Sequence, residues 1–260
     1  MKTKSGIRFL LPVLIIALIV AAAFMAPPKP VFYLVGDSTT RNPSRPMCGW
    51  GEVFSEQFDT TQITISNQAM AGRSTRTFLS EGRWDKVLSM LKPGDFVLIV
   101  FGHNEGSAPD TSRNGRRGVL RGTGEETKDL TWKDGKIETV HTYGWYLRKF
   151  VNEAKAKGAI PFIASMIPRN EFRDGKVLRA TNDYGKWSAE VAAQTGAFFV
   201  DLNNITADKY DKLGPDETKK LFPGDHTHTN VEGAKINAAS VAEGLRAIND
   251  CPVNKYLLNK

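Results

Sequence analysis

The sequence predicts an α/β domain in which a five-stranded parallel sheet lies between two layers of helices. Short apolar runs alternate along the chain with amphipathic stretches, and the run Asp95–Phe101 (DFVLIVF) is apolar from its second residue onward. A strand that is buried on both faces needs such a continuous run. Strands that are separated by helices form parallel sheets covered on both sides, which gives a three-layer αβα sandwich.

The expected elements follow from these patterns in chain order. We expect strands at Val31–Val35, Gln62–Ser66, Asp95–Phe101, Ile160–Ser165 and Ala197–Asp201. We expect helices at Gly49–Phe58, Thr75–Leu79, Trp84–Leu91, Thr142–Lys157, Ala180–Thr195 and Val231–Ile248. The helix at Thr142–Lys157 ends at Gly158, a residue typical of C-terminal caps. Right-handed crossovers place the carboxyl ends of all strands at one edge of the sheet, where ligands bind in such folds.

Residues 1–26 have the organisation of an export signal. Three basic residues precede an apolar run from Phe9 to Met25, and a proline-rich stretch follows. A basic start, an apolar segment and small residues near a cleavage site are typical of a signal peptide. A membrane anchor formed by residues 9–25 is the alternative, because about 17 apolar residues are the lower limit for crossing a bilayer. We therefore expect an exported protein, periplasmic or extracellular, with one domain at residues 31–250.

Charge and cysteine content restrict the classes of partner. The formal charge is +7 for the whole chain, and it falls to +4 without the three basic residues at the start. A mildly basic protein suits an acidic polymer, but the charge is too weak and too scattered to indicate nucleic acid binding. The two cysteines, Cys48 and Cys251, are predicted at opposite ends of the sheet, so we expect two unpaired thiols although export permits a disulfide.

The segment Gly106–Glu138 is unusual because it is long for a connector and rich in glycine and arginine. Connectors of this length inside a compact domain are usually functional or disordered. The chain shows no internal repeat and no second domain. We expect this segment to contribute to the edge of the sheet where the strands end.

Candidate catalytic groups follow the expected strand ends. Ser38, in Gly36-Asp37-Ser38-Thr39, follows the first strand, where a hydroxyl is exposed as a nucleophile, although serine also caps helices. Gly72 follows the second strand, and a glycine lets the backbone N–H approach a ligand closely. Asn104 follows the third strand and offers a side-chain N–H to an oxyanion. Gly72 and Asn104 are also common residues of ordinary turns.

A carboxylate and a histidine lie three residues apart before the last expected helix. Asp225 can orient the His228 imidazole while the other ring nitrogen faces a nucleophile. His226 raises the alternative of a metal site. Two histidines at positions i and i+2 of an extended loop point in opposite directions, however, and a third strong ligand is not evident. We therefore expect no metal.

The order of these groups along the chain resembles that of the SGNH hydrolases, also called GDSL-type esterases. A closer resemblance, to the rhamnogalacturonan acetylesterase family, covers nearly all of residues 31–249. The motifs that carry it are Gly36-Asp37-Ser38-Thr39-Thr40, Gly49-Trp50-Gly51, Asn67-x-Ala69-x-Ala71-Gly72-Arg73-Ser74-Thr75, Glu81-Gly82-Arg83-Trp84-Asp85, Lys92-Pro93-Gly94-Asp95, Phe101-Gly102-His103-Asn104 and Asp225-x-Thr227-His228. Gly-Arg-Ser and Glu-Gly-Arg-Trp-Asp together are much more specific than Gly-Asp-Ser.

The resemblance implies the flavodoxin-like SGNH hydrolase fold and a set of roles. Ser38 would be the nucleophile, His228 the base and Asp225 its orienting partner. The Gly72 N–H, the Asn104 side chain and the Ser38 N–H would form the oxyanion hole. No metal or organic cofactor is needed. The family more often has Asp where this chain has Glu105, which leaves open whether that carboxylate has a positioning role.

The resemblance also predicts an acetylated acidic polysaccharide, rhamnogalacturonan, as substrate. Arginines of the strand-end loops can pair with galacturonate carboxylates, and these candidates are Arg73, Arg76, Arg113, Arg116, Arg117 and Arg121. We select Arg73, Arg113 and Trp50 as substrate-binding residues. Solvated loop charges and a core tryptophan are the alternatives. An esterase or lipase acting on another acylated glycan or lipid, or a non-catalytic carbohydrate-binding protein, remains open. We expect a monomer with no nucleic acid partner and with membrane contact only through an uncleaved N-terminal segment.

Overall fold

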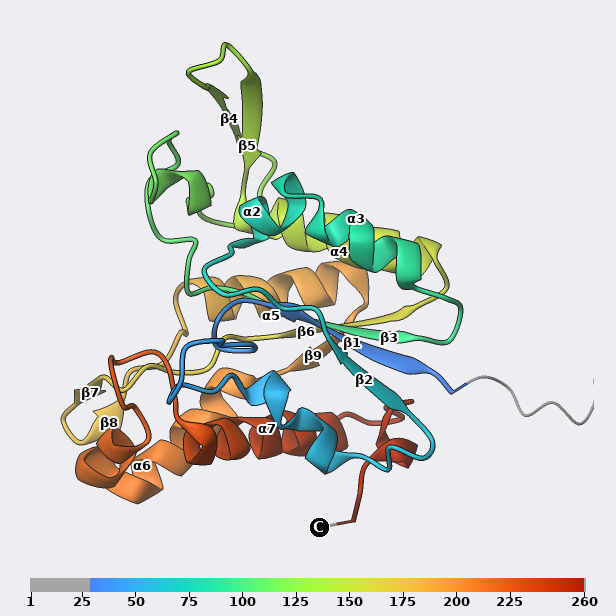
Figure 1. Ribbon diagram of the computed structural model, residues 1–260, viewed down its shortest axis with the longest axis vertical. Coiled ribbons are helices and arrows are strands. Elements are labelled where there is room, and N and C mark those ends of the chain that lie inside the picture. Colours follow the sequence, from blue (N-terminus) through green and yellow to red (C-terminus); the bar gives the residue numbers. More distant parts are fainter. Residues whose placement is uncertain (1–28, 260) are drawn as a thin grey trace, which may run out of the picture.

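The structure is a computed structural model that describes residues 29–259. The predicted signal peptide or anchor, residues 1–26, lies outside the described residues, so that prediction stays open. From residue 29 to residue 259, the chain has no helix that combines the length and the apolar character needed to cross a membrane. The described part forms one three-layer αβα sandwich (Figure 1).

Five parallel strands form the central sheet in the order β2-β1-β3-β6-β9, which confirms the predicted flavodoxin-like arrangement. Their bounds are β1 Val31–Gly36, β2 Thr64–Asn67, β3 Phe96–Val100, β6 Ile160–Ala164 and β9 Phe198–Val200. All four pairings are parallel, so every strand ends at the same edge. The loops after these ends carry the candidate site.

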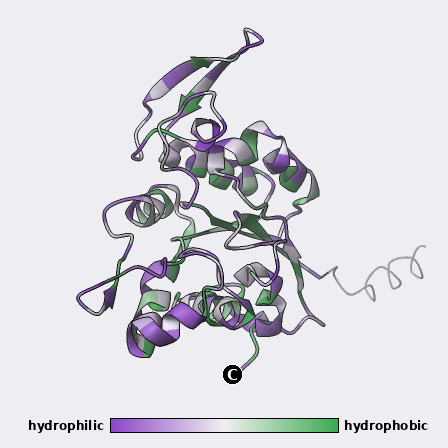
Figure 2. Cartoon of the chain, turned by 60° about the vertical axis from the view of Figure 1, so that its left-hand side comes forward, coloured by the Kyte–Doolittle hydropathy of each residue, from purple (hydrophilic) through white to green (hydrophobic). Residues whose placement is uncertain are grey.

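The strands bury apolar side chains on both faces because successive residues of a strand point to opposite sides. In β1, Phe32 and Leu34 belong to one core cluster, whereas Tyr33 and Val35 belong to the other. Figure 2 shows the apolar sheet between helical layers whose outer surfaces are largely hydrophilic. A continuous apolar run is thus the sequence pattern that this sandwich requires.

Helices cover both faces of the sheet. One layer contains α2 Thr75–Ser80, α3 Arg83–Met90, α4 Tyr143–Ala156 and α5 Tyr184–Thr195. The other contains the 3-10 helices η1 Trp50–Glu52 and η2 Phe54–Gln57 with α6 Leu202–Lys220 and α7 Val231–Arg246, while η4 Asn254–Tyr256 lies near the end of the chain. Side chains of Ser74, Thr142 and Asn230 accept backbone hydrogen bonds at the starts of α2, α4 and α7.

One helix prediction was wrong, and one helix was missed. The expected helix at Gly49–Phe58 is two short 3-10 turns, because the Trp50 and Gly51 N–H groups donate to the carbonyls of Thr39 and Thr40, each at 3.0 Å, and so dock against the loop after β1. The long helix α6 was not predicted. Its second half follows the non-helical Gly214 and begins with Pro215. Glycine and proline usually interrupt helices, so the sequence does not indicate one long helix here.

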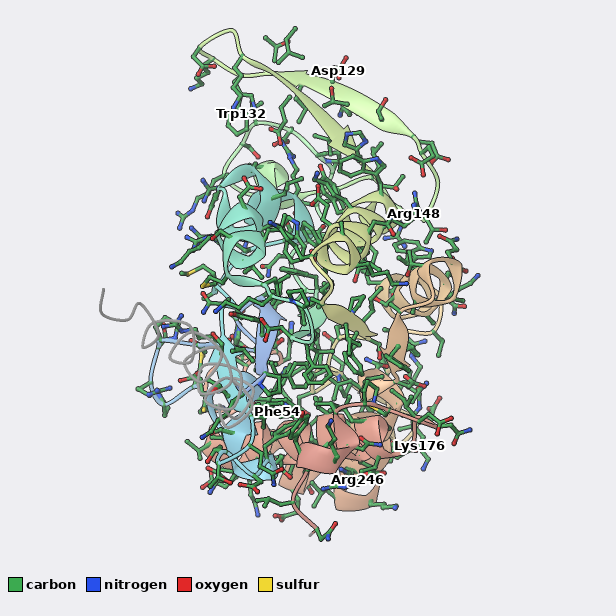
Figure 3. All side chains as sticks on the ribbon, turned by 90° about the vertical axis from the view of Figure 1, so that its right-hand side faces the viewer. Phe54, Asp129, Trp132, Arg148, Lys176 and Arg246 are labelled. Atoms are coloured by element: carbon green, nitrogen blue, oxygen red, sulfur yellow. The ribbon has the colours of Figure 1, made fainter. Side chains whose placement is uncertain are left out.

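The segment Gly106–Glu138 is more ordered than a plain loop. It contains η3 Gly115–Arg117 and, with the residues just after it, the hairpin β4 Thr127–Thr131 and β5 Ile137–His141, which projects beyond the helical layer (Figure 1). In Figure 3, Asp129 and Trp132 of this hairpin lie far from Arg246. A second small hairpin is formed by β7 Phe172–Arg173 and β8 Lys176–Val177. Both cysteines are buried and unpaired, as expected.

Candidate active site

Ser38, His228 and Asp225 form a continuous chain of side-chain contacts at the carboxyl edge of the sheet. Ser38 lies two residues after Gly36, the last residue of β1, and its Oγ lies 2.8 Å from His228 Nε2. His228 Nδ1 lies 2.7 Å from Asp225 Oδ2. The fold therefore brings together a hydroxyl and an imidazole that are 190 residues apart in the sequence.

Asp225 shapes its own loop as well as the imidazole. Its Oδ1 accepts hydrogen bonds from the backbone N–H groups of Thr227 (2.7 Å) and His228 (2.8 Å), and its Oδ2 faces the ring. Burial acts to raise the pKa of Asp225, but the hydrogen bonds from His228 and Thr227 outweigh it and hold the pKa below its usual value. The carboxylate is thus held ionised beside the imidazole.

The turn around Ser38 is built by its neighbour Asp37. The Asp37 Oδ1 accepts hydrogen bonds from the Thr39 N–H and from the Thr39 hydroxyl, each at 2.8 Å. The side chain of Asp37 therefore stabilises this turn, and the Ser38 hydroxyl is not used for it. The next helical element begins only at Trp50. Ser38 is therefore not a helix cap, and its hydroxyl is directed to His228 instead.

The three expected oxyanion donors lie on neighbouring loops. The Met70 N–H donates to the Gly36 carbonyl at 3.0 Å, which places the loop after β2 alongside the loop of Ser38. Gly72 has φ +73, a conformation that favours glycine. Within residues 29–259, neither the Ser38 N–H nor the Gly72 N–H makes a hydrogen bond. Both backbone donors are therefore available to a ligand.

The orientation of the Asn104 amide is held from both ends. Its Nδ2 donates to the Arg73 carbonyl at 3.1 Å, and its Oδ1 accepts from Arg117 Nη1 at 3.1 Å. The second hydrogen on Nδ2 remains for a ligand. Arg117 belongs to the inserted segment, and sequence reasoning did not single it out among the arginines there. Its hydrogen bond to Asn104 distinguishes Arg117 from the other arginines, and this bond is seen only in the folded structure.

Glu105 bridges two loops of the site. It is fully buried, and its two carboxyl oxygens accept from the Thr75 N–H and the Asn104 N–H, each at 2.9 Å. Burial, and secondly the nearby Asp37, raise the pKa of Glu105 to about 8, against the effect of these backbone donors. The sequence left open whether Glu105 has a positioning role, and its contacts tie the Asn104 loop to the start of α2.

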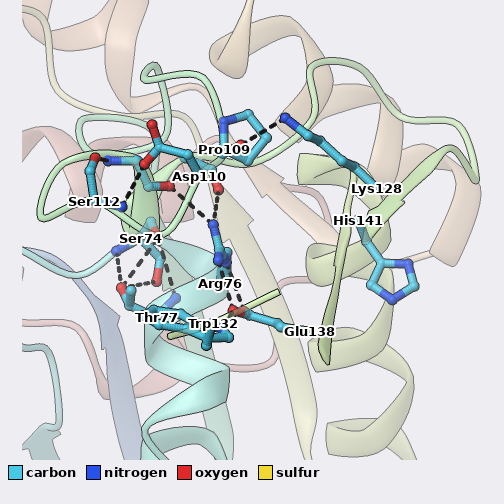
Figure 4. Close-up of polar contacts among 12 residues, drawn as sticks. Ser74, Arg76, Thr77, Pro109, Asp110, Ser112, Lys128, Trp132, Glu138 and His141 are labelled. Atoms are coloured by element: carbon cyan, nitrogen blue, oxygen red, sulfur yellow. Dashed lines mark hydrogen bonds and ion pairs between the residues drawn. The ribbon is translucent and has the colours of Figure 1, made fainter. Parts of the chain in front are cut away.

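Arg76 anchors the inserted segment and does not face the substrate side. Its side chain is 1% exposed, and it forms a two-pronged ion pair with Glu138 at 2.8 and 2.7 Å. Figure 4 shows this pair of Arg76 and Glu138. The Arg76 Nη1 also donates to the carbonyls of Gly115 and Gly118, at either end of η3. Its inclusion among the candidate substrate arginines was therefore wrong, and its role is to hold the turn that carries Arg117.

An arginine-lined cavity of about 380 Å³ adjoins the oxyanion donors. Gly72 belongs to its wall, with Arg73, Arg113, Asn114, Arg116 and Arg117. Arg73 also pairs with Glu81 at 2.9 Å, and Glu81 pairs with Arg83, which joins the two specific motifs of the sequence. Arg113 and Arg116 are exposed and have no ion pair within residues 29–259. The cavity thus presents positive charge beside the site, with no acidic residue in its wall.

Two of the other candidates occupy different places. Trp50 is fully buried, and its ring packs edge-on against Phe54 at 5.3 Å, so the assignment of Trp50 to substrate binding was wrong. His226 is 54% exposed and its ring lies 3.7 Å from Glu171, whereas the imidazole that contacts Ser38 is that of His228. Within residues 29–259, no three His, Cys, Asp or Glu side chains are grouped as metal ligands.

A hydroxyl, an imidazole and a carboxylate in this order, at the carboxyl edge of a flavodoxin-like sheet, define the arrangement of a hydrolase. The GDSL-like lipase/acylhydrolase family model matches residues 34–236, which is most of the chain. The protein belongs to this family and is an ester hydrolase.

Known relatives agree with the resemblance seen in the sequence. The chain is 36% identical over 223 residues to a rhamnogalacturonan acetylesterase of Emericella nidulans, covering 84% of this chain and 87% of that protein. It is 28% identical over 251 residues to one of Bacillus subtilis, covering 89% and 96%. The predicted relationship to rhamnogalacturonan acetylesterases is confirmed.

Solved structures confirm the fold. A Bacillus subtilis protein matches with a TM-score of 0.67 at 23% identity over 84% of this chain, which spans 56% of that protein. An acetylxylan esterase of Geobacillus stearothermophilus matches with a TM-score of 0.55 at 19% identity, covering 83% of this chain and 93% of that one. At these identities the likeness concerns the fold alone.

Proposed function

We propose that the protein is a serine carbohydrate esterase that removes O-acetyl groups from pectic polysaccharide, rhamnogalacturonan, through an acetyl-enzyme on Ser38. The observation that supports it most is the unbroken Ser38–His228–Asp225 chain beside an arginine-lined cavity. Two relatives that carry the name rhamnogalacturonan acetylesterase favour this ester and this polymer.

Acylation begins when neutral His228 accepts the Ser38 proton at Nε2 while Oγ attacks the acetyl carbonyl carbon. Asp225 keeps the Nδ1 hydrogen of the ring directed toward itself and stabilises the imidazolium that forms. The oxyanion accepts hydrogen bonds from the Ser38 N–H, the Gly72 N–H and the Asn104 amide. Each such donor is worth about 3–4 kcal/mol in the transition state.

The intermediate collapses when His228 returns the proton to the sugar oxygen, and the deacetylated sugar leaves. A water molecule then attacks the acetyl-enzyme, and His228 takes its proton as it did that of Ser38. His228 returns this proton to Oγ as the bond from Oγ to the acetyl carbon breaks, which releases acetate and restores the serine hydroxyl. This route needs no metal and no organic cofactor.

The arginine cavity is the feature that favours an acidic polymer. A galacturonate carboxylate there would meet Arg113 and Arg116, whose charges have no counter-charge within residues 29–259. Guanidinium groups bind carboxylates in two-pronged geometry, which positions the ligand as well as attracting it. An acyl lipid would require an apolar wall instead, and a neutral xylan chain would leave these charges unused.

Acetate release from a panel of esters tests this proposal. The panel contains acetylated rhamnogalacturonan, acetylated xylan and p-nitrophenyl acetate, each with the native protein and with Ser38→Ala. We expect the highest kcat/KM on rhamnogalacturonan and loss of all three activities in the variant. Activity confined to p-nitrophenyl acetate would contradict the pectic substrate, and substantial activity of Ser38→Ala would contradict the nucleophile. No activity on any ester would indicate a carbohydrate-binding protein.

We also propose export, on the strength of the sequence of residues 1–26 alone. N-terminal sequencing of the protein recovered from expressing cells measures whether the segment is removed. A mature chain that starts after residue 20 supports a signal peptide. An intact segment in a membrane fraction supports the anchor, and an intact segment in the cytoplasmic fraction would contradict export.

A further inference from the structure

A cavity of about 680 Å³ lies at the edge of the sheet opposite to the candidate active site. Its wall contains residues at the amino ends of β1, β3 and β6, among them Lys29, Asp95 and Ile160. These strands are parallel, so their amino ends share one edge and Ser38 lies beyond the other. The six residues of β1 separate the two edges by about 20 Å.

Three lysines from distant parts of the chain meet in the wall of this cavity. Lys29 precedes β1, Lys92 follows α3, and Lys255 belongs to η4. All three are exposed, and none forms an ion pair within the described part of the chain. The Lys29 Nζ donates to the Thr60 carbonyl at 3.5 Å, and the Lys255 Nζ lies 5.0 Å from the centre of the Tyr256 ring. Their charges are therefore open to an anionic partner.

The carboxylates near these lysines are engaged in local hydrogen bonds. Asp95 is the one acidic residue of the wall within residues 29–259, and it is buried, with its two oxygens accepting backbone N–H groups at 2.8 and 2.9 Å. Asp59 lies outside the wall, and its pKa is lowered mainly by hydrogen bonds, first that of the Thr61 hydroxyl, with the Lys29 charge contributing least. The cavity wall thus presents positive charge to solvent.

The chain enters the domain at this same cavity. The structure describes the chain from Lys29 onward, and Lys29 lies in the wall. The apolar run of the sequence ends at Met25, and the four residues from there to Lys29 span at most about 14 Å when extended. If residues 9–25 cross a bilayer, the surface around Lys29 is held close to the lipid headgroups, while Ser38 lies at the far edge.

Lysines beside a membrane anchor suit a bilayer with anionic headgroups. Each lysine near such a surface adds about fivefold in affinity. Tyr256 also lines the cavity, and tyrosine is enriched where proteins meet the membrane–water interface. An acidic polysaccharide would be attracted by the same charges, but binding at this edge would not bring its esters to Ser38. Both the charge and the short distance from the apolar run favour the lipid surface.

We infer that the cavity wall of Lys29, Lys92 and Lys255 is a docking surface for anionic phospholipid headgroups, with residues 9–25 retained as a membrane anchor. This inference goes beyond the proposed esterase activity and rests on the proposed export in its anchored form. Docking at the amino edge of the sheet turns the carboxyl edge, with Ser38 and the arginine cavity, away from the bilayer. The site then faces the aqueous side, where a polysaccharide can reach it.

The test places the intact chain in vesicles and attaches a dye to one new cysteine at either edge. Ser89→Cys lies in the cavity wall and Ser107→Cys lies in the loop after β3, and both serines are exposed, whereas the native cysteines are buried. The vesicles consist of phosphatidylcholine with or without phosphatidylglycerol and contain a quencher on the headgroups. We expect phosphatidylglycerol to increase the quenching at Ser89→Cys and not at Ser107→Cys.

Two pairs of substitutions make the test specific. Lys92→Gln with Lys255→Gln should lower the ratio of docked to undocked protein about fivefold for each lysine. Arg113→Gln with Arg116→Gln is the matched control, since it removes two charges from the opposite edge and should leave the quenching at Ser89→Cys unchanged.

Several results would overturn the docking surface. These are equal quenching at Ser89→Cys in the two kinds of vesicle, no effect of the lysine pair, stronger quenching at Ser107→Cys, or no quenching at either position. Removal of residues 9–25 in expressing cells would overturn it as well. The lysine pair should hydrolyse p-nitrophenyl acetate at the native rate, because both residues lie far from Ser38. Native hydrolysis without docking would therefore refute this surface alone and leave the proposed esterase standing.

Discussion

The contact between Arg117 and Asn104 predicts that a residue outside the proposed catalytic chain raises the rate of the chemical step. Arg117 Nη1 donates to Asn104 Oδ1 at 3.1 Å, and this bond is one of the two that hold the orientation of the amide. In Arg117→Ala the amide keeps one anchor, the 3.1 Å bond from Nδ2 to the Arg73 carbonyl. We expect kcat to fall because the oxyanion donor is no longer held in place.

The size of the loss follows from the bond that is removed. A hydrogen bond from a charged donor contributes about 1.5–3 kcal/mol. Arg117 is half-buried, and solvent screening of partly exposed charges favours the lower value. About 1.5 kcal/mol corresponds to about tenfold in rate. Removing the amide itself in Asn104→Ala should cost more, about 10²–10³-fold, as for other oxyanion donors.

Steady-state kinetics with p-nitrophenyl acetate measure this prediction. We expect Arg117→Ala to lower kcat about tenfold with a nearly constant KM, because the amide acts on the transition state. Arg116→Ala is the matched control. It also removes one positive charge from η3, but it leaves the hydrogen bond between Arg117 and Asn104 intact. The double variant with Asn104→Ala should be no slower than Asn104→Ala alone. Equal losses in Arg116→Ala and Arg117→Ala, or additive losses in the double variant, would refute the reasoning.

Two further predictions concern the base and the buried acid. His228→Ala should lower kcat at least about 10³-fold, as in other catalytic triads, whereas His226→Ala should change it by less than about twofold; p-nitrophenyl acetate assays that give the reverse order would move the base to His226. Glu105 holds a proton in the folded protein up to about pH 8, whereas the unfolded chain loses it near the ordinary pKa of 4.5. Its stabilising contribution is therefore complete below about pH 4.5 and is lost as the pH rises through 8, with a slope of at most about 1.4 kcal/mol per pH unit. Urea unfolding at pH 5.5 and 7.5 should show a smaller decrease for Glu105→Gln than for the native protein, and equal decreases would contradict the raised pKa.

Local patterns in the sequence were sufficient for the sheet and for the residues of the Ser38–His228–Asp225 chain. The run Asp95–Phe101 predicted a strand buried on both faces, because every position of such a strand must be apolar. Ser38, Asp225 and His228 were found because each lies in a short motif just after a strand or just before a helix. These inferences needed only neighbouring residues and the rule that parallel strands end at one edge.

Contacts between distant segments decided the rest. The helix expected around Trp50 became two short turns because its N–H groups bond to the loop after β1, and Trp50 itself lies in the core. Arg117 and Glu105 reach Asn104 and Thr75 through hydrogen bonds that span 13 and 30 residues, and the partner of Arg76 is 62 residues away. A charged residue in a loop has the same sequence pattern whether it meets solvent, substrate or a distant carboxylate. Only the tertiary structure separates these cases, because the partner that determines the role comes from another part of the chain.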